Sequence, residues 1–430
     1  MRLSTYVKIY PHKEDPDYLL FYSTKKASKV LLHKTILRSI EQGDISPSDA
    51  EPLTSLGFLV PDPEEEKKEM LGILDEANRR SRKFTAIVVM NLDCNLACRY
   101  CYEGGMKGKF YMSSETANQL ADFIERNHLA GGKNVEIDFY GGEPLLSFGL
   151  IKDISSRLKS AADSRGLEFT FTLVTNGTLL TAEKVVELTP LGLKGARITL
   201  DGPRENHNIF RPFKSGAGAF DIIIQNIKEV CGLTGIQIGG NYTRENYGEF
   251  PRLLDYLIRE GLTPGKIRMV KFDPVTRPGG EFALPDFSEG SESINEPWLF
   301  EASMFLREEV LKRGFDTFKI FPSPCMVELH NNIVSHYDGT LYKCPGMIGM
   351  KGLDVGGLRT GIKDFRVALD TDLWKNDECL ECAYLPICFG GCRYMRLLRD
   401  GKTGIDCRKP YLDATLEAMI KQDITYRRKG

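Results

Sequence analysis

The chain has 430 residues, of which 42% are hydrophobic and 27% charged, a balance typical of a folded protein with two or three domains. The 57 basic and 59 acidic side chains leave a net charge of -2, which excludes binding to nucleic acid or an anionic membrane through overall charge. No run of about 18 apolar residues occurs, and the first residues lack the apolar core of a signal peptide. We therefore expect a cytoplasmic protein with no membrane partner.

Residues 1–62 form the first predicted unit. Strands are expected over 6–10, 18–22 and 30–33, and helices over 35–42 and 48–56, an order typical of a winged helix. Residues 1–60 hold eight Lys or Arg and seven Asp or Glu, a net charge of only +1, so the pattern does not favour DNA binding. A structural cap is the simpler alternative role. Residues 63–83 predict a charged linker helix.

Residues 84–275 alternate predicted strands with amphipathic helices. The strands are expected over 85–90, 135–140, 168–174, 196–200, 236–242 and 267–272. Such alternation predicts an α/β fold with a parallel sheet, open or curled into a partial barrel, whose functional groups lie at the carboxyl ends of the strands. Residues 276–319 are a predicted bridging region, with a loop over 278–296 and a helix over 297–313, and residues 320–430 form the last domain.

Ten of the eleven cysteines fall into two groups. The first group, Cys94, Cys98 and Cys101, directly follows the first barrel strand. Three thiolates on one short loop can hold three irons of a [4Fe–4S] cluster and leave the fourth iron open, whereas structural zinc needs a fourth protein ligand. The remaining cysteine, Cys231, is expected to be a buried structural thiol.

The second cysteine group lies in the last domain. The Asp338-Gly339 dipeptide predicts a hairpin between strands over 333–337 and 340–343, which would fix the position of Cys344. A zinc ribbon remains an alternative to iron–sulfur ligation here. The group comprises Cys325, Cys344, Cys379, Cys382, Cys388, Cys392 and Cys407.

The first cysteine loop and the motifs at the strand ends resemble the radical SAM superfamily. The resemblance implies a partial (β/α)6 TIM-type barrel in which the first three cysteines hold a cluster that cleaves S-adenosylmethionine (SAM). Thr199 stands where the peptide- and protein-modifying members have Ser, and it keeps the hydroxyl. Judged singly, these residues are also compatible with ordinary turns or a solvated arginine. The implied SAM-binding residues are Tyr100, Gly141, Gly142, Glu143, Thr175, Asn176, Thr199, Arg211 and Phe272.

The second cysteine group resembles the SPASM domain, which implies two auxiliary [4Fe–4S] clusters and three clusters in all. The proximal auxiliary cluster is one ligand short. Either His330, His336 or water caps it, or its open iron accepts a substrate thiolate. The resemblance assigns Cys325, Cys344 and Cys392 to the proximal cluster, and Cys379, Cys382, Cys388 and Cys407 to the distal one.

The whole chain resembles radical SAM/SPASM maturases of ribosomally made peptides, of the geopeptide or ranthipeptide type. The resemblance implies cleavage of SAM to a 5′-deoxyadenosyl radical and a thioether crosslink from a Cys sulfur to a carbon of a precursor peptide. The N-terminal unit would bind the leader of that peptide by strand addition, and flavodoxin or ferredoxin would donate electrons.

Several alternatives stay open. Anaerobic sulfatase (formylglycine) maturases carry Asp directly after the second proximal cysteine, where this chain has Pro345 after Cys344. Epimerisation, a carbon–carbon crosslink and a non-enzymatic metal-binding peptide adaptor are the others.

Overall fold

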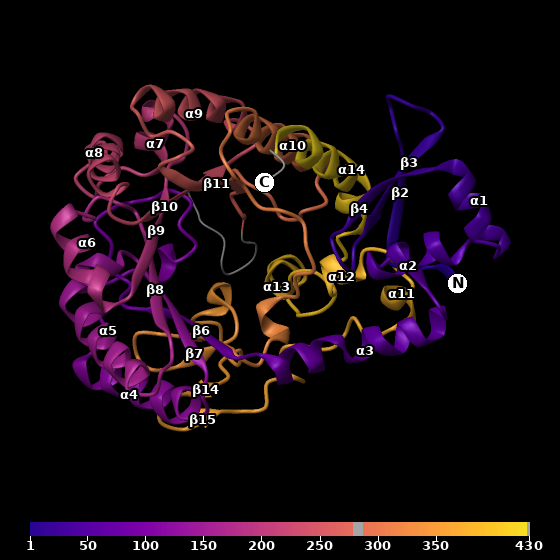
Figure 1. The fold of residues 1–430 in the computed structure, drawn as a ribbon. Helices are drawn as coiled ribbons and strands as arrows, with labels where there is room; N and C mark the ends of the chain where they lie inside the picture. Colours follow the sequence, from indigo (N-terminus) through magenta and orange to yellow (C-terminus); the bar gives the residue numbers. More distant parts are fainter. Residues whose placement is uncertain (278–286, 428–430) are drawn as a thin grey trace.

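The computed structural model describes residues 1–277 and 287–427, and its largest element is an eight-stranded, mostly parallel sheet (Figure 1). The order of its strands is β11-β10-β9-β8-β7-β6-β12-β13. The six parallel strands of the predicted barrel are therefore confirmed. They are β6 (Lys83–Val89), β7 (Asn134–Tyr140), β8 (Phe169–Thr175), β9 (Leu193–Thr199), β10 (Gly235–Tyr242) and β11 (Ile267–Pro274).

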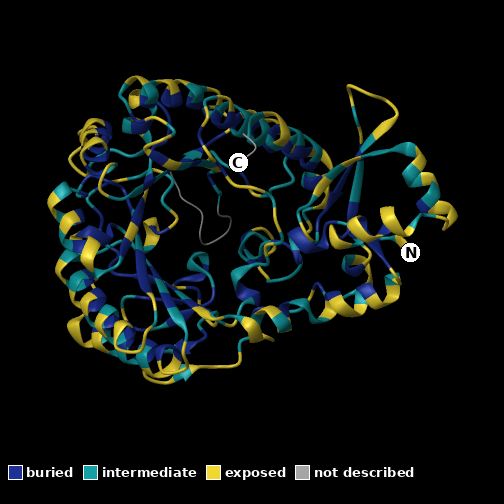
Figure 2. Ribbon diagram, in the orientation of Figure 1, coloured by how far each residue is buried: buried dark blue, intermediate teal, exposed yellow. Residues whose placement is uncertain are grey.

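Helices cover the outer face of this sheet, and their exposed sides face away from it (Figure 2). Strands β7 and β10 alternate between buried and half-buried residues, as expected for strands with one face against helices and the other toward the barrel interior. The Ser113 hydroxyl accepts a hydrogen bond from Thr116 N at 3.0 Å, as a helix N-cap does. The helices are α4 (Ser114–Ile124), α5 (Phe148–Asp163), α6 (Ala182–Leu188), α7 (Arg204–Phe210), α8 (Phe220–Val230) and α9 (Phe250–Arg259).

The predicted hairpin of the last domain is present, but it also belongs to the barrel sheet. Its strands are β12 (Asn332–Ser335) and β13 (Leu341–Tyr342), and β12 pairs in parallel with β6. The sequence signals of a hairpin are local, so they did not indicate that β12 also pairs with β6. As a result, the chain leading to Cys344 is fixed directly to the barrel.

The N-terminal unit contains a three-stranded antiparallel sheet of order β2-β3-β4. One face packs against α1 and α2 through a core that includes Phe21, Ile40, Leu53 and Phe58. The predicted strands and helices agree with the observed ones within one or two residues. The elements are β1 (Arg2–Leu3), β2 (Val7–Pro11), β3 (Tyr18–Ser23), β4 (Lys29–His33), α1 (Lys34–Gln42), α2 (Pro47–Ser55), β5 (Leu59–Val60) and the linker helix α3 (Pro63–Arg80).

The C-terminal cysteine-rich region lies between the barrel and the N-terminal unit (Figure 1). Part of the predicted loop over 278–296, residues 278–286, lies outside the described residues, and 287–296 form a loop. Within the described residues, no helix is long and apolar enough to cross a membrane. The remaining elements are α10 (Pro297–Lys312), β14 (Gly356–Gly357), β15 (Gly361–Ile362), α11 (Asp377–Leu380), α12 (Leu385–Cys388), α13 (Arg393–Asp400) and α14 (Lys409–Tyr426).

Candidate functional site

A cavity of about 490 Å³ opens at the carboxyl ends of the barrel strands. All three cysteines of the first group line it, and so do Cys344 and Cys392 of the second group. The structure also brings most of the residues implied to bind SAM to this cavity: Tyr100, Gly141, Gly142, Thr175, Asn176, Thr199 and Arg211. Parallel strands that end together explain this convergence of residues far apart in sequence.

The two glycines after β7 allow the backbone to pack closely against the segment that precedes Cys94. A Cβ atom at Gly141 would lie 2.3 Å from Asn91 O, and one at Gly142 would lie 2.1 Å from Asp93 O. Gly141 also has a φ of +128°, which side chains disfavour. Gly142 N donates to Asn91 O at 3.0 Å. The glycines therefore position the first cysteine loop.

Glu143 lies behind the cavity and does not line it. Its carboxylate is fully buried and accepts hydrogen bonds from the Thr175 hydroxyl (2.8 and 2.9 Å), Asn176 N (2.8 Å) and Leu145 N (3.0 Å). Burial raises the pKa of Glu143, and these donors oppose the rise. Glu143 thus fixes the end of β8 to the end of β7, which orients the Thr175-Asn176 segment toward the cavity.

The thiols of the first group lie close to one another. Burial raises the pKa of Cys94 to about 11, with Cys98 adding to the rise and the Lys107 ammonium opposing it. Burial also raises the pKa of Cys101, again against Lys107 and with Cys98. Asn176 Nδ2 approaches Cys94 Sγ at 3.7 Å. The Lys107 ammonium therefore faces all three thiols and the Asn176 amide faces Cys94, and both favour negative charge on sulfur against the effect of burial.

Tyr100 and Arg211 belong to a buried hydrogen-bond network. The Tyr100 hydroxyl donates to the Asp201 carboxylate and accepts from Arg211 Nη1 (2.8 Å) and Asn241 Nδ2 (3.0 Å). Burial lowers the pKa of Arg211, but Cys98, Tyr100 and Asp201 raise it by more, so its guanidinium remains charged.

Sequence reasoning did not assign Asp201 and Asn241 to the site. Asp201 is fully buried, and Asn241 N donates to its Oδ1 at 2.7 Å. The available signal was position, because Asp201 follows the end of β9 by two residues and Asn241 is the penultimate residue of β10. Both ends point toward the same cavity.

Cys325, Cys344 and Cys392 form a second set of neighbouring thiols. Burial raises the pKa of Cys344 to about 12, and the nearby Cys392 and Cys325 raise it further. His336 and His330 were the two histidines expected as possible caps of the proximal cluster. His336 contacts Asp338 through Nδ1 at 3.1 Å, and His330 is exposed. Neither histidine is among the described residues that line the cavity.

The other four cysteines of the last domain form a third set. Burial raises the pKa of Cys379, and the nearby Cys388, Cys382 and Cys407 raise it further. In residues 1–277 and 287–427, no three His, Cys, Asp or Glu side chains lie close enough to bind a single metal ion. The thiolates of a [4Fe–4S] cluster bind separate irons, so sets of three, three and four cysteines fit such clusters. Cys231 is half-buried rather than buried, because it caps the C-terminus of α8 near the surface.

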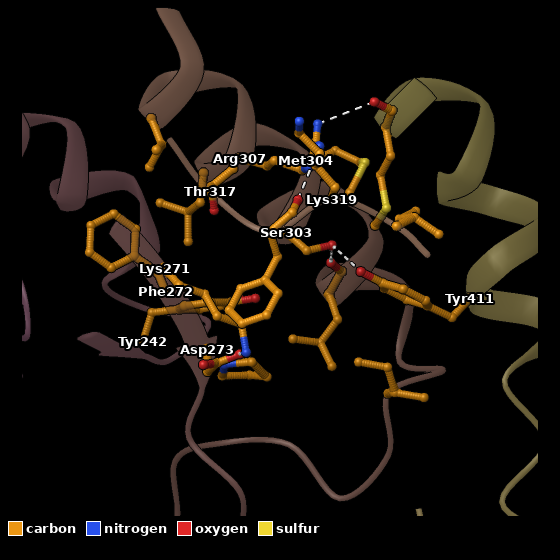
Figure 3. Close-up of a pocket in the computed structure, with 18 residues that line it drawn as sticks. Tyr242, Lys271, Phe272, Asp273, Ser303, Met304, Arg307, Thr317, Lys319 and Tyr411 are labelled. Carbon is orange, nitrogen blue, oxygen red and sulfur yellow. Dashed lines mark hydrogen bonds and ion pairs between the residues drawn. The ribbon is translucent and has the colours of Figure 1, made fainter. Parts of the chain in front are cut away.

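Phe272 does not reach the cavity described above. It lines a separate cavity of about 230 Å³ between β11, α10 and α14, together with Tyr242, Asp273 and Tyr411 (Figure 3). Its ring packs edge-on against Phe250, with the ring centres 4.6 Å apart. Pro274 and Val275, which follow Phe272 closely, line the cysteine cavity instead.

Comparison with known proteins agrees with this architecture. Residues 88–257 match the Radical SAM superfamily. The chain is 30% identical to Fe-coproporphyrin III synthase of Methanosarcina barkeri over 233 residues, 53% of this chain but only 51% of the synthase. It is 30% identical to a probable GTP 3′,8-cyclase of Methanopyrus kandleri over 51% of this chain and 68% of the cyclase. A cysteine-type anaerobic sulfatase-maturating enzyme of Clostridium novyi is 22% identical over 70% of this chain and 85% of the relative.

The solved structures that share the fold include the following two. Native anSMEcpe with bound AdoMet and Kp18Cys peptide matches with a TM-score of 0.62 and 16% identity, over 78% of this chain and 98% of that one. Streptococcus suis SuiB bound to precursor peptide SuiA matches with a TM-score of 0.53 and 15% identity, over 94% of this chain and 98% of SuiB.

The barrel and the three-cysteine loop at its mouth define a radical SAM enzyme. The chain belongs to the Radical SAM superfamily. Membership implies SAM and one [4Fe–4S] cluster as cofactors. The residues present fit them, because the cavity combines three thiols with a glycine backbone and a charged arginine.

Proposed function

We propose that this enzyme modifies a ribosomally made precursor peptide by forming a thioether between a Cys sulfur and a carbon atom. The observation that carries the proposal is that one cavity contains the first cysteine group and, from another domain, Cys344 and Cys392. A sulfur held at the second group and a carbon near the first would therefore meet in the same cavity.

We propose three [4Fe–4S] clusters, held by the three cysteine sets. When bound, the first cluster and SAM supply the one-electron chemistry that removes a hydrogen atom from the peptide. The chain's own part is to bind and orient. Arg211 and Asn176 face the SAM side, and Glu143 and Asp201 hold those residues in place.

Atoms and electrons balance in the proposed crosslinking reaction. The peptide carbon loses a hydrogen atom, the thiol loses a proton, and one further electron leaves as the sulfur–carbon bond forms. The hydrogen atom would pass to the 5′-deoxyadenosyl group derived from SAM. The auxiliary clusters that the second and third cysteine sets would hold are the proposed electron acceptors, and a flavodoxin or ferredoxin is the proposed electron donor to the enzyme.

The N-terminal unit is the proposed binding site for the leader segment of the precursor. Strand β4 pairs with β3 on one side only within the described residues, so its other edge can accept an added strand. Leu31 of β4 is 44% exposed, which leaves an apolar side chain at that edge. The likeness of the chain to SuiB along 94% of its length includes this unit and supports a role with peptides.

Formylglycine formation is the second candidate. The sulfatase-maturating relative and the anSMEcpe structure favour it. Pro345 argues against it, because it occupies the position after Cys344 where a carboxylate base would be needed, and it lines the cavity itself.

The test is to incubate the reconstituted enzyme with SAM, a reductant and a cysteine-containing candidate precursor. A thioether predicts a peptide that loses two hydrogens, keeps its sulfur and has one thiol fewer to alkylate. Formylglycine would lose the sulfur, epimerisation would leave the mass unchanged, and a carbon–carbon crosslink would leave the thiol free. Any of these three results would contradict the thioether proposal.

A further inference from the structure

The N-terminal unit is packed tightly against the distal cysteine set, here defined as Cys379, Cys382, Cys388 and Cys407. In one hydrophobic cluster, Tyr6 contacts the side chains around α11 and α12, and Cys379 packs on that cluster. In a second cluster, residues of β2 and β3 meet α12 and α14, with Cys382 and Cys388 packed against them. Side chains of the N-terminal unit thus complete the surroundings of three of the four distal cysteines.

Two buried hydroxyls of the N-terminal unit reach the backbone of the segment that carries Cys379 and Cys382. Tyr6 Oη donates to Leu380 O at 2.9 Å, and Thr24 Oγ1 donates to Ala383 O at 2.5 Å. Leu380 lies between the two cysteines, and Ala383 follows the second. Tyr6 and Thr24 are both fully buried, so water cannot replace either donor without rearrangement.

The two donors are also connected to each other and to the sheet. Thr24 N donates to Tyr6 O at 2.9 Å, and Thr24 directly follows β3. Strand β3 is the neighbour of β4, whose outer edge is the proposed binding site for the leader peptide. Only β4 would therefore separate an added strand from β3, and Thr24, directly after β3, contacts the segment that carries Cys379 and Cys382.

We propose that Tyr6 and Thr24 are positioning residues for the distal iron–sulfur cluster, so that the peptide-recognition unit and this cluster form one coupled structural unit. The proposal rests on the proposed function for the identity of the cluster. Hydrogen bonds and dipoles around a cluster set its reduction potential and its retention of iron. A carbonyl that loses its donor can turn, which changes both the dipole near the sulfur atoms and the geometry of the segment.

The experiment compares Tyr6→Phe and Thr24→Val with Tyr22→Phe in full-length protein with all clusters reconstituted. Tyr22 is a matched control, because Tyr22→Phe keeps the ring that packs in the cluster beside Cys382 and Cys388 and removes only a hydroxyl that donates at 3.1 Å to Ile320 O, a carbonyl outside the distal set. The measurements are the midpoint potential and the electron paramagnetic resonance spectrum of the distal cluster, which a Cys379→Ala variant identifies, and the rate of iron loss to a chelator. No peptide is added.

We expect Tyr6→Phe and Thr24→Val to shift the potential and spectrum of the distal cluster alone. We also expect distal iron to be lost about fivefold faster, as for one missing buried hydrogen bond. Values equal to those of Tyr22→Phe would overturn the proposal. Wild-type protein with no distal iron would overturn both this proposal and the proposed cofactors, whereas failure of leader binding alone would not alter these measurements.

Discussion

Glu143, which follows Gly141 and Gly142 after the end of β7, offers a sharp test of how the site is held together. Glu143→Gln replaces one carboxylate oxygen with an NH2 group and removes the charge. The carboxylate accepts from Leu145 N through Oε1 and from Asn176 N through Oε2, and the Thr175 hydroxyl lies between the two oxygens. The single oxygen of Gln can satisfy only one of the two backbone donors.

The other N–H group is then buried without an acceptor, which costs about 1–3 kcal/mol, and the remaining hydrogen bonds lose their charge assistance. Relief of the buried charge offsets part of this cost. We therefore expect the free energy of unfolding to fall by about 2 kcal/mol, and the affinity for SAM to fall because the Thr175-Asn176 segment is no longer fixed.

Glu103→Gln is the matched control. Glu103 is also buried, at 3% exposure, but its Oε1 has no hydrogen-bond partner, and burial raises its pKa to about 7. This substitution should change the free energy of unfolding by less than about 0.5 kcal/mol. The assay is urea unfolding of both variants with calorimetric titration of SAM. A Glu143→Gln variant as stable as Glu103→Gln would refute the positioning role.

Three further predictions follow from the structure. Cys94→Ala should abolish formation of 5′-deoxyadenosine, whereas Cys407→Ala should retain part of it and form no crosslinked peptide; full cleavage by Cys94→Ala would contradict the cluster assignment. Burial lowers the pKa of His128 to about 4, so between pH 6.5 and 4 the unfolded chain binds more protons than the folded chain. The free energy of unfolding should therefore fall by up to about 3 kcal/mol as the pH is lowered from 6.5 to 4. His128→Phe keeps the stacking on Phe84 and should lose less stability on acidification; an unchanged pH profile would refute this cause. Leu31→Asp on β4 should weaken precursor binding about tenfold. Leu233→Asp is the control, because Leu233 is similarly exposed (47%), and it should leave the affinity unchanged. Equal affinities of the two variants would exclude the β4 edge as the binding site for the leader.

The sequence predicted the elements well where the signals are local and periodic. The six barrel strands and the strands and helices of the N-terminal unit appear close to their expected bounds, because period-two and helical patterns record burial directly. The resemblance to the radical SAM superfamily implied the cavity residues, and all of them except Glu143 and Phe272 line the cavity. They converge there because a parallel sheet gathers its strand ends at one edge.

The misses have a common physical cause, which is that they depend on tertiary contacts. Phe272 ends in a different cavity because its ring packs against Phe250 rather than toward the barrel interior. The pairing of β12 with β6 depends on a chain separation of more than 200 residues. The hydrogen bonds of Tyr100 to Asp201 and Asn241 were likewise not predicted, since Asp201 follows the end of β9 and Asn241 lies in β10.

The docking of the N-terminal unit also affects how its role can be tested. Tyr6 and Tyr22 are buried against the C-terminal region, so removal of residues 1–62 would expose apolar surface and disturb the distal cysteines. Loss of activity in such a deletion would not report on leader binding alone. Substitutions at the exposed edge of β4 avoid this problem.

Whether ten cysteines hold three [4Fe–4S] clusters is tested most directly by measuring iron and acid-labile sulfide per chain after anaerobic reconstitution. Three such clusters contain about 12 irons and an equal amount of sulfide, and we expect these values. About four irons, with or without zinc, would leave only the cluster of Cys94, Cys98 and Cys101 and would contradict the assignment of the second cysteine group.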